Sequence, residues 1–298
     1  MPRVRARIVQ HVEDDRERSG APRSYVRRDT ELGSWEVAER RPAPDLRKLV
    51  STCRAYAQQR PVPSSHRTMP MPGVPLVISL GGPHVIRDRA GGVVTRGSFV
   101  AGPHERDVVV EADGFVGLQA DLTPLGALRL VGGGLHELAG QIVELEDILG
   151  VADARRLVDD LACEPDPHRR TARLEASLRA RLASAPPPCP KVAWALERIS
   201  RTSGAVPVGL LAAELGWSTR HLTRRFRERV GLPPKRFARV VRCHRAATLL
   251  ERPDGPGLAE IAQLAGYYDQ AHLTNEVREL CGRTPAELRA RILDAMPA

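Results

Sequence analysis

The sequence predicts an α+β protein, in which a mainly-β, barrel-like N-terminal domain precedes an all-α C-terminal domain with two helix-turn-helix units. Short apolar runs between glycine- and proline-rich turns extend to about Val143, as in a small barrel or sandwich. Helical periodicity replaces this pattern from Thr123–Gly126 onward. The chain has 298 residues, which is enough for two domains of roughly 100–200 residues each.

We divide the chain into four segments. Residues 1–30 are polar, charged and aperiodic, which predicts a disordered arm. Residues 31–150 are expected to form the β domain, and residues 151–188 a helical connector that ends in a linker. Residues 189–298 are expected to form the helical domain. The linker is Pro186-Pro187-Pro188-Cys189-Pro190, because such a run of prolines cannot continue a helix.

The β domain contains short strand patterns that are bounded by turn residues. We expect strands at Pro75–Leu80, Val108–Glu111 and Gly114–Ala120, and a hairpin turn at Arg89–Gly92. Leu46–Gln59 is expected to be a helix inside this region. Aromatic residues make up only 4% of the chain, so the core must consist mainly of aliphatic side chains.

The connector is expected to contain helices at residues 153–162 and 168–184. In the second of these, Leu174, Leu178 and Leu182 recur every four residues and form one apolar stripe. This stripe has two interpretations, which the sequence leaves open. It is either a dimer seam or a surface that packs on its own domain.

Seven helices are expected after the linker. Glycines 216, 231, 255, 266 and 282 lie at the expected helix ends, where a positive φ is easily adopted by glycine. The expected helices are Val192–Arg201, Pro207–Leu215, Thr219–Val230, Pro233–Leu250, Leu258–Ala265, Gln270–Leu280 and Pro285–Leu293.

Positive charge is concentrated in one stretch of this helical region. The whole chain has a formal net charge of +9. Residues 218–245 contain ten Lys and Arg residues and one acid, Glu228, whereas residues 246–298 are net acidic. A focused basic patch favours a polyanionic partner such as nucleic acid.

The first helix-turn-helix pattern places this charge on a helix that can read DNA. A short helix ends at Gly216, and Ser218 is positioned to cap the next one. The core side of that helix holds the residues that recur every fourth position, namely Leu222, Phe226 and Val230. The opposite side holds the candidate DNA-binding residues Arg220, Thr223, Arg224 and Arg227. Arginine can bridge guanine edges or pair with phosphates.

The same design recurs about 50 residues later. Gly266 corresponds to Gly216, and the second turn is one residue longer, so Asp269 takes the capping position of Ser218. Leu273 and Val277 take the core places of Leu222 and Phe226. We call the second helix of each unit, which begins at Thr219 or at Gln270, a reading head. Two reading heads about one helical turn of DNA apart can enter successive major grooves on one face of the DNA, and the long helix Pro233–Leu250 would set their separation.

Two segments of the second unit carry a resemblance to a known family. Gly266-Tyr267-Tyr268-Asp269-Gln270-Ala271-His272-Leu273 and Cys281-Gly282-Arg283-Thr284-Pro285 resemble the signature of AraC/XylS-type transcription regulators. The resemblance covers about residues 190–293. It implies a seven-helix domain with two recognition helices, whose reading residues are Arg220, Thr223 and Arg224 in the first and Gln270, Ala271 and Asn275 in the second.

The chain departs from the family pattern in the second recognition helix. The family usually has phenylalanine where Val277 stands and often a basic residue where Asn275 stands. We expect Glu276 to add further acidity. The resemblance therefore suggests that the two units contribute unequally to DNA binding, and that the first supplies most of the attraction to phosphate.

The N-terminal region more weakly resembles cupin-like sensor domains. The similarity rests on the turns Gly81-Gly82-Pro83-His84 and Phe99-Val100-Ala101-Gly102-Pro103. In the family such a domain often binds an effector, dimerises, or both, and here the effector-binding residues are unknown.

We predict neither a metal site nor a cofactor. The candidate ligands His84, His104, Glu105 and His136 lack the closely spaced histidine pair of cupin metal sites. None of the five cysteines has metal-like or redox-motif spacing. The clustered cysteines of alkylation-repair regulators, which carry a similar DNA-binding domain, are absent.

The leading interpretation is a non-enzymatic, cytoplasmic, sequence-specific DNA-binding transcription regulator, an activator or a repressor. The expected partners are double-stranded DNA and, as further candidates, RNA polymerase, a small-molecule effector and a second copy of the chain. No signal peptide or membrane span is predicted. Two alternatives are a ligand-free regulator with a structural N-terminal domain and an enzyme domain that is targeted to DNA.

Overall fold

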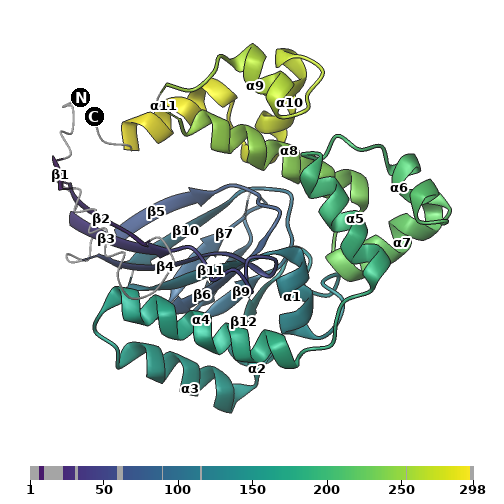
Figure 1. Cartoon of the computed structure of the whole chain (residues 1–298). Coiled ribbons are helices and arrows are strands. Elements are labelled where there is room, and N and C mark those ends of the chain that lie inside the picture. Colours follow the sequence, from purple (N-terminus) through teal and green to yellow (C-terminus); the bar gives the residue numbers. More distant parts are fainter. Residues whose placement is uncertain are drawn as a thin grey trace.

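The computed structural model describes residues 7–9, 23–30, 33–58, 63–88, 90–114, 116–252 and 254–295. Within these residues, strands dominate up to about residue 122 and helices dominate the rest, so the predicted α+β class is confirmed (Figure 1). The strands are β1 (Arg7–Val9), β2 (Arg23–Thr30), β3 (Gly33–Arg40), β4 (Val50–Gln58), β5 (Pro63–Thr68), β6 (Val74–Ser79), β7 (His84–Arg87), β8 (Val93–Arg96), β9 (Phe99–Ala101), β10 (Val108–Asp113), β11 (Val116–Leu122) and β12 (Ile142–Glu144).

The strands form two antiparallel sheets. The larger sheet has the order β1-β2-β3-β4-β11-β6-β9-β12, and the smaller sheet has the order β5-β10-β7-β8. Apolar residues of both sheets, including Val77, Ile86 and Phe99, pack together between them. The predicted barrel is wrong in one respect. Among the described strands the two sheets remain separate, and no pairing closes them into a barrel.

Alternating side chains decide which face of the larger sheet is covered. In β11, Leu118, Ala120 and Leu122 are buried on one face. All three lie directly opposite β6, with Leu118 paired to Ile78, Ala120 to Leu76 and Leu122 to Val74. Successive residues of a strand point to opposite faces, so these residues form a continuous apolar surface.

Four helices follow or interrupt the β region. They are α1 (Pro124–Val131), α2 (Leu145–Leu149), α3 (Val151–Ala162) and α4 (Pro167–Ser184). Helix α4 contacts β3 and β4, and Figure 1 shows it along one side of the sheet with α3 beyond it. Leu174, Leu178 and Leu182 are buried in this contact. The leucine stripe therefore packs on its own domain and is not available as a dimer seam.

The predicted C-terminal helices are confirmed, with ends that differ by a few residues. They are α5 (Pro190–Arg201), α6 (Val208–Glu214), α7 (Thr219–Val230), α8 (Pro234–Leu250), α9 (Leu258–Leu264), α10 (Gln270–Cys281) and α11 (Pro285–Ala295). Helix α8 runs from the α6–α7 pair to the α9–α11 group (Figure 1). Gly216, Gly231, Gly266 and Gly282 have positive φ, whereas Gly255 does not.

The expected helix at Leu46–Gln59 is wrong. Residues 50–58 form β4, which lies between β3 and β11. Cys53 and Ala55 are buried on the covered face, while Arg54 points to the other face and binds Asp121 of β11. Period-two burial and two neighbouring strands outweigh the local helical pattern.

The expected disordered arm at residues 1–30 is wrong for two segments. Residues 23–30 form β2, which pairs with β3 along its whole length, and residues 7–9 pair with β2 as β1. Backbone hydrogen bonds to a neighbouring strand do not require apolar side chains, so composition does not reveal such a strand. The expected hairpin between β7 and β8 is present, although its Arg89 and the Phe115 of the strand pattern at 114–120 lie outside the described residues.

Within the described part of the chain, no helix is both long and apolar enough to cross a membrane.

Replacement of Leu178 by alanine tests the packing of α4. Leu178 is 3% exposed, so Leu178→Ala should lower the free energy of unfolding by about 2–5 kcal/mol through lost burial and a cavity. Leu264→Ala is the matched control, because Leu264 of α9 is 48% exposed and its loss should change stability by about 0.5 kcal/mol or less. Urea denaturation measures both, and equal losses would contradict the assignment.

Candidate nucleic-acid interface

The first helix-turn-helix unit consists of α6 and α7. Ser218 caps α7, because its Oγ accepts a hydrogen bond from the His221 backbone N–H at 3.2 Å, as predicted. Gly216 in the turn has φ +65°, a conformation that disfavours a residue with a Cβ atom. Both features fix the angle at which α7 leaves the turn.

The two sides of α7 differ as the sequence predicts. Leu222, Phe226 and Val230 are buried, and Phe226 contacts Phe237 of α8 with ring centroids 5.7 Å apart. Arg220, Arg224 and Arg227 are exposed, and Thr223 is half-buried. These four side chains thus lie on the surface that the sequence assigned to DNA.

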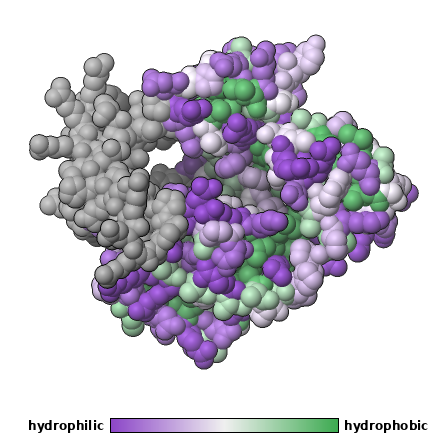
Figure 2. Space-filling view, viewed as in Figure 1, coloured by the Kyte–Doolittle hydropathy of each residue, from purple (hydrophilic) through white to green (hydrophobic). Residues whose placement is uncertain are grey.

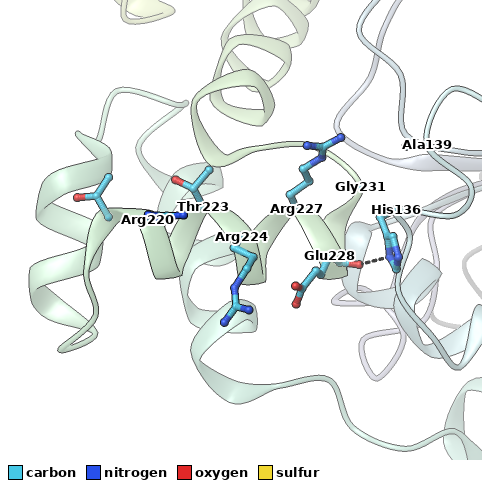
Figure 3. A pocket seen from close by; sticks show the side chains of 9 residues that line it. His136, Ala139, Arg220, Thr223, Arg224, Arg227, Glu228 and Gly231 are labelled. Atoms are coloured by element: carbon cyan, nitrogen blue, oxygen red, sulfur yellow. Dashed lines mark hydrogen bonds between the residues drawn. The ribbon is translucent and has the colours of Figure 1, made fainter.

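A groove of about 860 Å³ runs along this surface. Figure 3 shows Arg224 and Arg227 leaving α7 in different directions, with His136 of the N-terminal region at the far end of the helix. The groove therefore has one wall from the recognition helix and one from the loop that follows α1. Its lining residues are His136, Ala139, Thr219, Arg220, Thr223, Arg224, Arg227, Glu228 and Gly231.

The second unit, α9 and α10, repeats this design. The Asp269 carboxylate caps α10 by accepting a hydrogen bond from the His272 backbone N–H at 2.7 Å, as predicted. Leu273 and Val277 are buried. The extra residue of the turn is Tyr268, which is 91% exposed. The candidate reading residues Gln270, Ala271 and Asn275 are all exposed.

The sequence suggested that Glu276 adds acidity to the DNA-facing surface of α10, and this prediction is wrong. Its side chain is only 6% exposed and faces α8. There it binds Arg239 at 2.9 Å and Arg242 at 3.1 Å. Arg239 also binds Glu279 at 2.5 Å. This cluster of ion pairs holds α10 against α8. The sequence does not reveal this role of Glu276, because its arginine partners lie 34 or more residues away along the chain.

Fewer basic side chains of residues 218–245 are free of ion pairs than the sequence count implies. Four of the ten basic residues form ion pairs, namely Arg225, Arg236, Arg239 and Arg242. Their partners include Glu105, which comes from the N-terminal region. The other six, which include Arg220, Arg224 and Arg227, have no ion pair among the described residues, so the unneutralised charge gathers on and near α7. Figure 2 shows hydrophilic residues interspersed with apolar ones on that side of the molecule.

Two cysteines that are distant in the sequence meet in the second unit. The Sγ atoms of Cys243 in α8 and Cys281 in α10 lie 3.4 Å apart in a buried position. The hydrogen bond between the two thiols, together with burial, raises the pKa of Cys243 far above its usual value. A thiol that resists ionisation is a poor nucleophile and a poor metal ligand, so this pair acts as core.

The four residues considered as metal ligands have separate surroundings. His84 is buried beside Phe99, and His104 donates its Nδ1 proton to the Gly102 carbonyl at 3.0 Å. Glu105 binds Arg236, and His136 donates its Nδ1 proton to the Glu228 carbonyl at 2.7 Å. Within the part of the chain that the structure describes, no group of three or more His, Cys, Asp or Glu side chains is arranged to hold a metal ion.

Comparison with known proteins identifies the class of the C-terminal region. Residues 211–291 match the family model described as a helix-turn-helix domain. With two capped recognition helices and the signature at residues 266–285, this region is a helix-turn-helix domain of the AraC type.

Individual relatives resemble parts of the chain. A probable bifunctional transcriptional activator/DNA repair enzyme AlkA of Mycobacterium tuberculosis is 37% identical over 81 residues, which are 27% of this chain and only 16% of that protein. An AraC-type transcriptional regulator from Chromobacterium violaceum is 25% identical, covering 37% of this chain and 96% of its own, with a TM-score of 0.33. ToxT from Vibrio cholerae is 10% identical over 77% of this chain and 97% of its own, with a TM-score of 0.45.

Removal of Glu276 tests the ion cluster between α8 and α10. Glu276→Ala leaves two mostly buried guanidinium groups without their shared carboxylate, so the free energy of unfolding should fall by about 3 kcal/mol. Glu279→Ala removes a partner of the same Arg239, but the Glu279 side chain is 66% exposed, and the cost should stay below about 1 kcal/mol. Thermal or urea unfolding compares them. Similar losses would mean that Glu276 is no more than a surface partner.

Proposed function

We propose that this protein is a sequence-specific, non-enzymatic transcription regulator that binds double-stranded DNA through α7 and α10. The observation that carries the proposal is the pair of helix-turn-helix units, each with a capped recognition helix whose polar side is exposed. A helix of this kind fits the major groove of B-DNA, where each base pair presents a distinct hydrogen-bonding pattern.

The two recognition helices are suited to different tasks. Exposed arginines of α7 can neutralise phosphates, which releases counterions and makes affinity fall with salt, or can bind guanine edges. The exposed amides Gln270 and Asn275 of α10 suit adenine edges. We propose that α7 supplies most of the electrostatic attraction and that α10 contributes mainly base reading.

The N-terminal region serves, in this proposal, as a cupin-like domain that senses an effector or supports dimerisation. Its support is the two-sheet sandwich that precedes the helix-turn-helix domain. Contact with RNA polymerase would make the protein an activator, and occlusion of a promoter would make it a repressor. A regulator of this type works at the chromosome, so the proposal places the protein in the cytoplasm.

The enzyme alternative has less support. The probable repair enzyme of Mycobacterium tuberculosis shares only a segment of 81 residues with this chain, in the helix-turn-helix region. In a thermal-shift screen against metabolites, a ligand that raises the melting temperature would support sensing by the N-terminal region. Metal analysis of the purified protein separates an enzyme with a metal centre from a regulator.

The proposal predicts unequal effects of substitutions in the two heads. Arg224→Ala should weaken binding to a genomic site, enriched by pull-down with the purified protein, by roughly tenfold or more, because one good bidentate contact with a base edge contributes about 1–3 kcal/mol. Asn275→Ala should weaken it less. Arg225→Ala is the matched control, since Arg225 lies on the same helix but binds Glu228, and it should leave affinity almost unchanged.

Binding is measured by fluorescence anisotropy over a salt titration. Equal losses of DNA affinity for Arg224→Ala and Asn275→Ala would refute the proposed unequal contributions of α7 and α10. Weak, sequence-independent binding by the unaltered protein would refute the proposed function itself.

A further inference from the structure

Two loops of the N-terminal region hold the C-terminal ends of both recognition helices. The first loop, residues 102–107, joins β9 to β10, and the second, residues 132–141, joins α1 to β12. We call them together the two-loop bracket. Helix ends leave their last four carbonyl groups without partners inside the helix, and the bracket supplies donors to some of them.

The second loop holds α7. The Leu135 backbone N–H donates to the Arg229 carbonyl at 3.0 Å. His136 donates its Nδ1 proton to the neighbouring Glu228 carbonyl at 2.7 Å, the bond drawn in Figure 3. Both carbonyls belong to the last turn of α7, so this end of the first reading head is fixed to the N-terminal region.

The first loop holds α10 and α8. The Asp107 backbone N–H donates to the Leu280 carbonyl at 3.2 Å, in the last turn of α10. Arg67 of β5 binds the buried Asp107 carboxylate and so anchors this donor. Two residues earlier in the loop, Glu105 binds Arg236 of α8 at 3.3 Å.

The two loops are one unit. The Gly140 N–H donates to the Pro103 carbonyl and the Gly102 N–H donates to the Gln141 carbonyl, each at 2.9 Å. Gly231, in the turn between α7 and α8, packs against both: a Cβ atom there would lie 2.9 Å from the Leu135 carbonyl oxygen and 3.1 Å from Pro103 Cγ. A movement of one loop therefore moves the other.

We propose that the two-loop bracket, and not helix α8 alone, sets the separation and relative orientation of the two reading heads, and so determines which spacing of DNA half-sites the protein accepts. This inference rests on the proposed function. Each added base pair moves a half-site by about 3.4 Å and rotates it by about 35°. Recognition helices that are held by the bracket as well as by α8 follow such a change poorly, whereas a helix released from the bracket follows it more easily.

Two adjacent glycines offer a matched pair of variants. A Cβ atom at Gly134 would collide with the Glu228 carbonyl oxygen, so Gly134→Ala must push the second loop away from α7. A Cβ atom at Gly133 meets no other atom within 4 Å. Neither glycine has a positive φ, so backbone strain does not distinguish them. His136→Ala is a second variant, which removes one bond of the bracket without a collision.

The first experiment measures the affinity of the full chain for its enriched site with zero, one or two base pairs inserted or deleted between the half-sites. The unaltered protein and Gly133→Ala should lose at least tenfold in affinity at a change of one base pair. Gly134→Ala and His136→Ala should flatten this dependence to about threefold or less. Spacing profiles for both variants that match the unaltered protein would overturn the proposal.

A second experiment does not depend on DNA. Spin labels at Ala213→Cys on α6 and Gln263→Cys on α9, both exposed positions, report the distance between the heads, after Cys163→Ser and Cys189→Ser remove the more accessible native thiols. Gly134→Ala should broaden the distance distribution, and Gly133→Ala should not. Equal distributions would overturn the proposal even if a DNA site is found. Broadening without any specific DNA site would refute the proposed function but keep the bracket.

Discussion

The rest of the structure depends on one continuous apolar core that joins the larger sheet to the first helix-turn-helix unit. Side chains from β4, β11, α4, α7 and the first half of α8 belong to the same buried cluster. Because protein interiors are densely packed, α7 cannot shift on the sheet without opening this core. The second unit has its own smaller core, to which, among the described residues of the N-terminal region, only Met69 adds a partly buried side chain. The first reading head is thus part of the N-terminal body, and the second is attached to it through α8 and the bracket.

The charged residues also differ between the two helix-turn-helix units. Arginine has two roles in the helical region, and the position of an acidic partner decides between them. Arg239 and Arg242 join α8 to α10 through Glu276, where low exposure makes the shared carboxylate important. Arg220, Arg224 and Arg227 have no acidic partner among the described residues and face a groove. The net charge of the sequence therefore overstates the charge that a DNA phosphate meets, and it hides that this charge belongs mostly to one head.

The contacts between the two-loop bracket and the ends of α7 and α10 allow a change in the N-terminal region to affect the DNA-binding surface. His136 and Ala139 line the same groove as the reading residues of α7, and the adjoining backbone groups bind the helix end. A change in the sandwich that displaced either loop would reach both recognition helices, since the loops are hydrogen-bonded to each other. The N-terminal region and the two recognition helices are thus joined in large part by backbone groups, which tolerate many side chains at the same positions.

Local patterns in the sequence determined the seven C-terminal helices, both caps, the buried side of each recognition helix and the exposed side that the DNA proposal uses, because each depends on residues within a few turns of one another. They also determined the strands of β6, β10 and β11, whose apolar runs are bounded by turn residues. Only the tertiary structure decided that residues 50–58 form a central strand, that Glu276 serves α8 rather than the surface, and that Leu178 packs on its own sheet. The glycine run at 132–134 was visible, but not its purpose, since the carbonyl that requires Gly134 to lack a side chain lies 94 residues further along the chain. Such contacts depend on which distant segments the core brings together, and no local pattern records that choice.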